Sequence, residues 1–277
     1  MKLRVGLSTC PNDTFLFHGL LSGTSERFGL DLDFALLDIE ELNEELASGA
    51  LHVGKASFAQ AFHLARDFGV LPVGSAIGFG VGPLVVAPRA GPPPGAEARV
   101  LTPGAATTAH ALLRLLLPAV AQVRHVHFAS IMPALLRGEA DAGVVIHEGR
   151  FTYRALGLTC VADLGARYEE AQRAPLPLGG LLARKALGAD VQRRLAQALR
   201  ASLAAARADR EAAFATMQRH AQELAPAAIW QHVDLYVNDL TAELGPRGAD
   251  ALDRFAAALR GAGLVPADLP PLERLPG

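Results

Sequence analysis

The sequence has very little cysteine. Its 277 residues contain only Cys10 and Cys160, far apart and outside any C-x-x-C motif. Secreted domains stabilised by disulfides, and zinc sites built from thiolates, both need more cysteine at closer spacing. The scarcity indicates a reducing compartment and provides no metal-site spacing. The 51% hydrophobic and 19% charged residues are typical of a globular protein.

Concentrated charge and long apolar runs are also missing. The formal net charge is −2, and the 26 basic residues form no block. Proteins that bind nucleic acid or anionic membranes carry such blocks, and a membrane helix needs about 20 apolar residues in succession. The apolar stretch before Cys10 is too short for a signal peptide, and Arg4 interrupts it. We therefore expect a cytoplasmic protein with no nucleic-acid or membrane partner.

Several common cofactor and catalytic motifs are absent. There is no G-x-G-x-x-G after a strand, no G-x-x-x-x-G-K-[ST], no H-E-x-x-H and no G-x-S-x-G. These motifs hold dinucleotides, nucleoside triphosphates, zinc and a nucleophilic serine, respectively. Nucleotide cofactors, a catalytic zinc and serine-hydrolase chemistry are therefore not expected.

The sequence does contain an alternation of strand and helix patterns. Strands are expected over residues 3–7, 32–37, 52–56, 81–87, 99–102, 123–128, 143–146 and 176–183. Helical patterns separate most of them, and four more helices are expected over residues 191–207, 210–222, 227–239 and 249–261. Such alternation predicts an α/β fold with mainly parallel sheets.

A proline-rich connector, RAGPPPGAEA at residues 89–98, divides this alternation in two. The chain is long for one core, since single cores stop growing at roughly 250–300 residues. We expect lobe one to comprise residues 1–88 and 176–277, and lobe two residues 92–175. Open α/β sheets bind ligands beyond the carboxyl ends of their strands, so the cleft between the lobes is the expected site.

Polar residues at the strand ends are the candidates for this cleft. They are Ser8, Thr9, Asn12, Lys55, Ser57, Thr102, Thr107, Thr108, His147, Glu148 and Arg150. Several precede predicted helices, where free N–H groups favour an anion such as a carboxylate. Asn12 is expected to be a helix cap. Ser57 and the pair Thr107 and Thr108 are either caps alone or caps that also contact a ligand. Glu148 and Arg150 are expected to pair and to fix the loop that carries His147.

His147 ends a buried strand, Val144–Ile146, in the predicted cleft. The ordinary pKa of histidine, about 6.5, suits a general base at neutral pH. The histidines inside helical patterns are expected to pack or to lie at the surface: His18, His63, His110, His220 and His232. From spacing alone, a catalytic role and a capping or structural role both remain open for His147.

A set of segments, in order along the chain, resembles one enzyme family. They are STCPNDTFLFHGLL, DIEELN, GVGPLVVA, TTAHALL, GVVIHEGRFTY, LPLGGLLARK and IWQHVDLYVN, and they lie between residue 3 and about residue 240. No single segment is specific, but the ordered set is similar to the 1,4-dihydroxy-6-naphthoate synthases of the futalosine route to menaquinone.

The resemblance implies a fold like that of type II periplasmic binding proteins, with two α/β lobes and a hinged cleft. It implies a cytoplasmic carbon–carbon lyase that converts cyclic dehypoxanthine futalosine to 1,4-dihydroxy-6-naphthoate, without a metal or organic cofactor. The family's general base falls on His147. Its substrate-contacting K-x-S and T-T-A motifs fall on Lys55, Ala56 and Ser57 and on Thr107, Thr108 and Ala109. Ala106, just before the second motif, leaves the local loop shape open.

Two other functions remain open. Chorismate dehydratase, an enzyme of the same fold and pathway, eliminates water and does not split a carbon–carbon bond. A solute-binding protein of an uptake system also has this fold, and a fold alone does not decide function. The missing export signal argues against the second. The sequence does not predict an oligomeric state.

Overall fold

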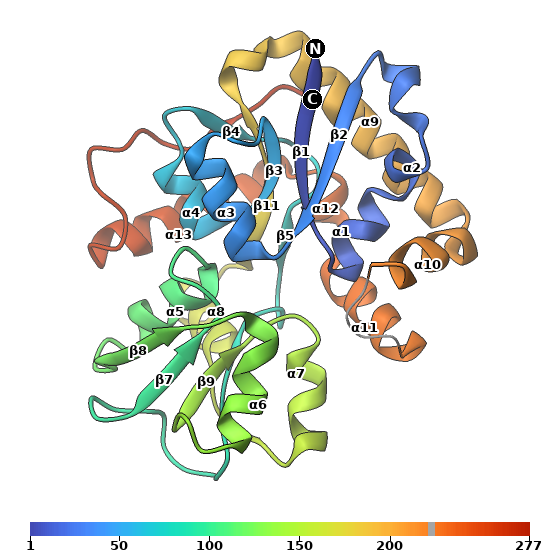
Figure 1. Cartoon of the computed structure of the whole chain (residues 1–277). Helices are drawn as coiled ribbons and strands as arrows, with labels where there is room; N and C mark the ends of the chain where they lie inside the picture. The colour runs from blue at the N-terminus through green and yellow to red at the C-terminus, as the bar shows by residue number, and fades with distance from the viewer. Residues whose placement is uncertain (221–224) are drawn as a thin grey trace.

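The computed structural model describes residues 1–220 and 225–277, and it consists of two sheets covered by helices (Figure 1). The first sheet has the strand order β12-β4-β11-β3-β1-β2, and β5 pairs with β11. Its strands are β1 (Lys2–Ser8), β2 (Asp31–Leu37), β3 (Val53–Ser57), β4 (Phe68–Val70), β5 (Ala76–Gly78), β11 (Leu176–Arg184) and β12 (Glu273–Arg274). The second sheet has the order β10-β6-β9-β7-β8. Its strands are β6 (Leu84–Ala87), β7 (Arg99–Thr102), β8 (Gln122–His125), β9 (Ala142–Val145) and β10 (Thr159–Asp163).

Helices connect the strands and cover both sheets, which confirms the predicted α/β class. The first group is α1 (Pro11–Leu16), α2 (His18–Leu21), α3 (Ile39–Ser48), α4 (Phe58–His63), α5 (Thr108–Leu116), α6 (Ile131–Leu136), α7 (Gly149–Thr152) and α8 (Leu164–Gln172). The C-terminal group lies beside the first sheet (Figure 1): α9 (Gly188–Ala208), α10 (Arg210–Gln218), α11 (Pro226–Tyr236), α12 (Asp239–Ala242) and α13 (Gly245–Gly261). Short 3-10 turns span Thr24–Phe28, Phe128–Ser130, Tyr153–Leu156 and Lys185–Leu187.

The sheets are mixed, so the prediction of mainly parallel sheets is wrong. β1 runs parallel to β2 and β3, but β11 runs antiparallel to β3, β4 and β5. In the second sheet, β6 runs antiparallel to β9 and β10. The reason is that the chain crosses between the sheets at the cleft, which is the carboxyl edge of the parallel strands. β6 and β11 enter their sheets from that edge and therefore run in the opposite direction.

The predicted boundary after residue 88 does not match the strand pairing. β6, which precedes that boundary, pairs with β9 and β10 of the second sheet. The first crossing therefore lies between β5 and β6, in the glycine-rich segment 79–83. The return crossing leads into β11, which pairs with β3 in the first sheet. That the two parts move as separate lobes remains a prediction.

Local sequence explains how the elements near the cleft begin and end. Asp38 caps α3, because its carboxylate accepts the Glu41 N–H while the Glu41 carboxylate accepts the Asp38 N–H. Gly49 ends α3 with a φ of 82°, a conformation that glycine adopts without strain. All residues of β9 are buried, as expected for a central strand covered on both faces.

The apolar core is continuous between the two sheets. One cluster of buried side chains contains Phe62 and Phe255 from the part around the first sheet, and Val85 and Val144 from the second. Tyr168 of α8 also packs edge-on against Phe255, with ring centroids 5.4 Å apart. This shared core holds the two parts against each other around the cleft. Among the residues that the structure describes, no helix is both long and apolar enough to cross a membrane.

Some elements were not predicted from the sequence. They are the short strands β4, β5, β10 and β12 and the helices α7 and α8. The helix predicted over 210–222 ends at Gln218 in the described part, and the final residues of that prediction, 221 and 222, lie outside the described residues.

Two glycine backbones meet where the first crossing passes α8. A Cβ added to Gly165 would lie 2.5 Å from the Cα atom of Gly82 and 2.9 Å from its nitrogen. Alanine would raise helix propensity in α8 by about 1 kcal/mol, but a clash with backbone cannot be relieved by a rotamer change. We expect Gly165→Ala to lower the free energy of unfolding by about 1–3 kcal/mol in urea titrations. Gly91→Ala is the control, because nothing lies within 4 Å of its added Cβ; equal stability of the two variants would contradict the expected clash.

Candidate functional site

A pocket lies between the two sheets, at the carboxyl ends of β1 and β3 and at the start of α5. The empty space in it, including its opening to solvent, is about 660 Å³. Most of the predicted site residues line it: Lys55, Ser57, Thr107, Thr108, Ala109 and His147. Apolar side chains complete the wall: Ile39, Ala76, Val81, Pro83, Ile146 and Leu178. The pocket therefore combines apolar surface with a few polar groups.

His147 follows β9 and forms part of the pocket wall. Its φ of 52° is uncommon for a residue other than glycine, and this conformation turns the chain as it leaves the strand. Its ring packs edge-on against Phe128, with centroids 4.9 Å apart. Burial lowers the pKa of the imidazole, although Glu148 opposes this by raising it. His147 is therefore neutral at pH 7 and able to accept a proton.

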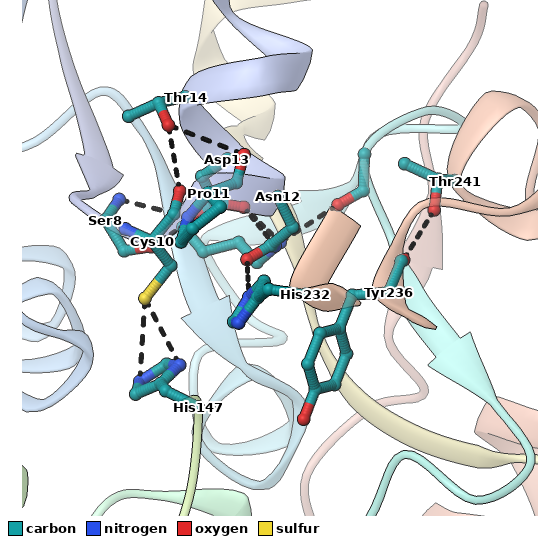
Figure 2. Close-up of polar contacts among 12 residues, drawn as sticks. Ser8, Cys10, Pro11, Asn12, Asp13, Thr14, His147, His232, Tyr236 and Thr241 are labelled. Carbon is teal, nitrogen blue, oxygen red and sulfur yellow. Dashed lines mark hydrogen bonds and ion pairs between the residues drawn. The ribbon is translucent and has the colours of Figure 1, made fainter. Parts of the chain in front are cut away.

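Cys10 contacts His147 from the start of α1 (Figure 2). Its Sγ atom lies 3.2 Å from Nδ1 and 3.7 Å from Nε2 of the imidazole. Burial raises the pKa of the thiol, which therefore stays protonated at neutral pH. The sulfur holds the ring in place from the first-sheet side of the cleft, a role that the sequence did not reveal.

A buried ion pair joins β3 to the start of α1. Lys55 Nζ donates to Asp13 Oδ1 at 2.7 Å, and the two side chains are 7% and 1% exposed. Asp13 also accepts from the Ser8 hydroxyl at 2.7 Å and from the Asn12 amide at 2.9 Å. Lys55 makes a second bond to the Gly74 carbonyl. The Asp13 carboxylate therefore fixes three polar groups of the pocket wall: the Ser8 hydroxyl, the Asn12 amide and the Lys55 ammonium.

Asn12 is not the helix cap that was predicted. α1 begins at Pro11, with Cys10 at the cap position and no side-chain capping bond. A proline at the first helical position tolerates this, since its nitrogen has no hydrogen to satisfy. Asn12 lies one residue further on and bridges Asp13 to Nε2 of His232, which is 2.8 Å from the Asn12 Oδ1 atom.

Ser57 is held by a second buried amide. The Asn43 side chain donates to the Ser57 hydroxyl at 3.2 Å and accepts the Ser57 N–H at 2.9 Å. Ser57 occupies the cap position of α4 but makes no side-chain capping bond. Its hydroxyl hydrogen is therefore available to a ligand in the pocket, which favours ligand contact over a cap alone.

Thr107 and Thr108 both have hydroxyl groups that are already bonded within the protein. Thr107 caps α5 by accepting the His110 N–H, and its hydroxyl donates to the Gly104 carbonyl. The Thr108 hydroxyl donates to the Leu178 carbonyl at 2.7 Å and accepts the Ala59 N–H. The first-turn N–H groups at 108 and 109 have no partner within the helix. These N–H groups, and not the hydroxyls, are the donors on offer to a ligand.

The loop before α5 is held from across the cleft. The Glu40 carboxylate accepts the Ala106 N–H at 3.0 and 3.2 Å. Burial raises the pKa of Glu40, and the Ala106 N–H opposes this shift. Together with the bonds of Thr108, this contact orders the segment whose shape the sequence left open.

Some predicted residues lie elsewhere. Ala56 does not line the pocket. Side chains alternate between the two faces of a strand, so Lys55 and Ser57 face the pocket while the Ala56 side chain lies in the apolar core. Thr102 bonds His125, and Thr9 lies outside the pocket. Among the described residues, Arg150 does not pair with Glu148; it donates to the Gly82 carbonyl at 2.8 Å.

Three pocket residues with polar side chains were not predicted from the sequence: Asp13, His232 and Tyr236. Asp13 lies in α1, next to the residue that was predicted as its cap, and the other two lie on α11, far from any strand end. All three lie in the segments that carry the family resemblance, STCPNDTFLFHGLL and IWQHVDLYVN, which is the signal that could have found them. In the described part of the chain, no group of three or more His, Cys, Asp and Glu side chains is placed to hold a metal ion.

The amino-acid sequence matches a known family model over most of its length. Residues 3–260 match the model described as menaquinone biosynthesis. A 1,4-dihydroxy-6-naphthoate synthase of Thermus thermophilus is 43% identical over 264 residues, which cover 95% of this chain and 96% of the relative. One of Streptomyces coelicolor is 41% identical over 277 aligned residues, with coverages of 96% and 95%.

Two solved structures are similar to this chain in fold. A crystal structure of a protein from Archaeoglobus fulgidus superposes with a TM-score of 0.90 at 31% identity, covering 95% of this chain and 98% of that one. A Candida albicans protein described as having the generic periplasmic binding protein fold gives a TM-score of 0.72 at 12% identity, covering 98% and 92%. The second match bears on the fold alone and confirms the predicted fold class. By its family model and its two relatives, the chain belongs to the menaquinone biosynthesis family and groups there with the 1,4-dihydroxy-6-naphthoate synthases.

Proposed function

We propose that this enzyme converts cyclic dehypoxanthine futalosine to 1,4-dihydroxy-6-naphthoate by carbon–carbon cleavage in the cytoplasm, with His147 as the general base. The observation that carries this proposal is a neutral, half-buried imidazole at the wall of a pocket that also presents Lys55, Ser57 and the start of α5. The apolar wall suits a bicyclic ring system, and the polar groups suit a carboxylate and hydroxyls.

The chemistry begins with proton transfer to His147. The imidazole removes the proton of a hydroxyl on the sugar-derived part of the substrate. The oxygen then forms a carbonyl as the adjacent carbon–carbon bond breaks, and the bond's electron pair passes into the ring system in a retro-aldol sense. Aromatisation of the bicycle supplies the driving force, so the protein needs to supply a base, orientation and charge stabilisation.

The remaining polar groups stabilise the charge that develops on the ring. Lys55 has one donor left after its bonds to Asp13 and Gly74, and the Ser57 hydroxyl hydrogen is unused. The N–H groups at the start of α5 add donors and the positive end of the helix dipole. Donors fixed in advance of the reaction stabilise developing charge at little reorganisation cost.

The direct test is a product assay. Purified protein, treated with a chelator, is incubated with cyclic dehypoxanthine futalosine or with chorismate, and products are identified by mass. Formation of 1,4-dihydroxy-6-naphthoate supports the proposal and a reaction without added metal. Loss of water from chorismate would instead indicate a chorismate dehydratase, and binding without turnover of either compound would indicate a solute-binding protein.

Removing the base should abolish turnover while substrate still binds. General acid–base catalysis contributes about 10²–10⁴-fold, so we expect His147→Ala to reduce kcat by at least that range. Substrate affinity, measured by calorimetry, should change little because the anion-binding groups remain. His63→Ala is the matched control, since His63 is exposed and bonds the backbone carbonyl of Leu264, away from the pocket. A His147→Ala enzyme with most of its activity would rule out the assignment.

The pH dependence of kcat/KM should report the pKa of His147. Because burial lowers this pKa, activity should rise with pH through a limb below the ordinary value of 6.5 and stay level above it. Glu148 raises the pKa of His147, so Glu148→Gln should move the limb to lower pH. A limb that stays in place or moves to higher pH would show that His147 does not control the rate.

A further inference from the structure

A buried nitrogen at the pocket lacks a partner. His232 lines the pocket from α11 and is 1% exposed. Within the described part of the chain, its Nδ1 atom has no hydrogen-bond partner. Leaving a buried polar atom unsatisfied lowers stability. Because His232 lines a pocket, a group of the ligand can supply the missing partner.

The network around Asn12 determines which atom of His232 carries the hydrogen. Asp13 accepts hydrogen bonds only, so the atom of Asn12 that faces it must be the amide nitrogen. The amide oxygen of Asn12 then faces His232 Nε2 at 2.8 Å and needs a donor there. Nε2 of His232 is therefore the N–H, and Nδ1 carries the lone pair.

Burial keeps this imidazole neutral. It holds the pKa of His232 well below the ordinary range, and the nearby His147 and Lys55 lower it further. A neutral imidazole with a strongly lowered pKa is a poor base, but its lone pair still accepts a hydrogen bond. The two pocket histidines therefore suit different tasks, since the acidic groups around His147 partly offset the effect of burial there.

We propose that His232 Nδ1 accepts a hydrogen bond from a second hydroxyl of the sugar-derived part of the substrate, next to the hydroxyl on which His147 acts. This inference rests on the proposed function of the pocket. The two rings are nearly parallel, and their centroids are 6.3 Å apart. Figure 2 shows both imidazoles on the same side of the start of α1, below Cys10 and Asn12. One hydroxyl-bearing group can therefore contact both rings.

A hydroxyl is the group that fits this position best. A carboxylate or carbonyl oxygen would face the lone pair of Nδ1 with its own lone pairs and be repelled. A hydroxyl donates to Nδ1 and can accept from another group. His232 would thus select substrates that carry a hydroxyl at this position, because an analogue without it leaves Nδ1 unpaired in the closed pocket.

The test uses a variant that removes Nδ1 alone. In His232→Gln, the side-chain NH₂ group can still donate to Asn12, as Nε2 does, but the amide oxygen does not occupy the position of Nδ1. We expect kcat/KM with cyclic dehypoxanthine futalosine to fall about 10- to 100-fold, mainly through KM. His18→Gln is the matched control, because His18 is half-buried, bonds Thr216 and lies outside the pocket. Wild-type kinetics in His232→Gln would overturn the inference.

A second measurement applies even where His232→Gln fails to fold. In ¹⁵N-histidine spectra of the His147→Ala protein, added cyclic dehypoxanthine futalosine should shift the Nδ1 resonance of His232 and leave those of His18 in place. An unmoved Nδ1 resonance at saturating substrate would overturn the inference. If the wild-type protein turns over this substrate and His232→Gln matches it, the inference alone fails; if the wild-type protein does not, the proposed function fails and the inference with it.

Discussion

The ion pair between Lys55 and Asp13 is the interaction on which the rest of the pocket depends. It links β3 to the start of α1, with 2.7 Å between Lys55 Nζ and Asp13 Oδ1, and both side chains are almost out of contact with water. Taking two charges out of water costs several kcal/mol per ion, so a pair of this kind contributes little net stability over apolar replacements. The ion pair matters because it positions the polar groups around it. Asp13 orients Ser8 and Asn12, and Asn12 in turn sets the hydrogen on His232.

The other half of the site comes from the second sheet and meets this network across the cleft. His147 follows β9 and contacts Cys10 of the first part. Two hydrogen bonds also cross the cleft. The Thr108 hydroxyl donates to the Leu178 carbonyl, and the Ala106 N–H donates to the Glu40 carboxylate. Burial lowers the pKa of His147 and raises that of the Cys10 thiol, so both groups are uncharged at neutral pH. The cleft thus holds a neutral base beside donors that are already oriented.

Much of the fold and part of the site could be predicted from the sequence. Long strands such as β1 and β11 have clear apolar patterns, and the rule that ligands bind at strand ends led to Lys55, Ser57 and His147. The short strands β4 and β12 were missed because two or three residues carry no period. The antiparallel strands were missed because strand direction follows from where the chain crosses between sheets. Asp13 and His232 were missed because their roles arise from packing between α1 and α11, which local patterns do not encode.

The most direct test of this account is a thermodynamic cycle on the pair, with Lys55→Met, Asp13→Leu and the double variant. Each single change should lower the free energy of unfolding by about 3–5 kcal/mol, because it leaves a buried charge without its partner. The double variant should recover most of that stability but not kcat/KM, since Ser8, Asn12 and His232 lose their anchor and the pocket loses the Lys55 ammonium. If the double variant recovered both stability and activity, or if the two losses of stability simply added, the pair would not be the element that organises the pocket.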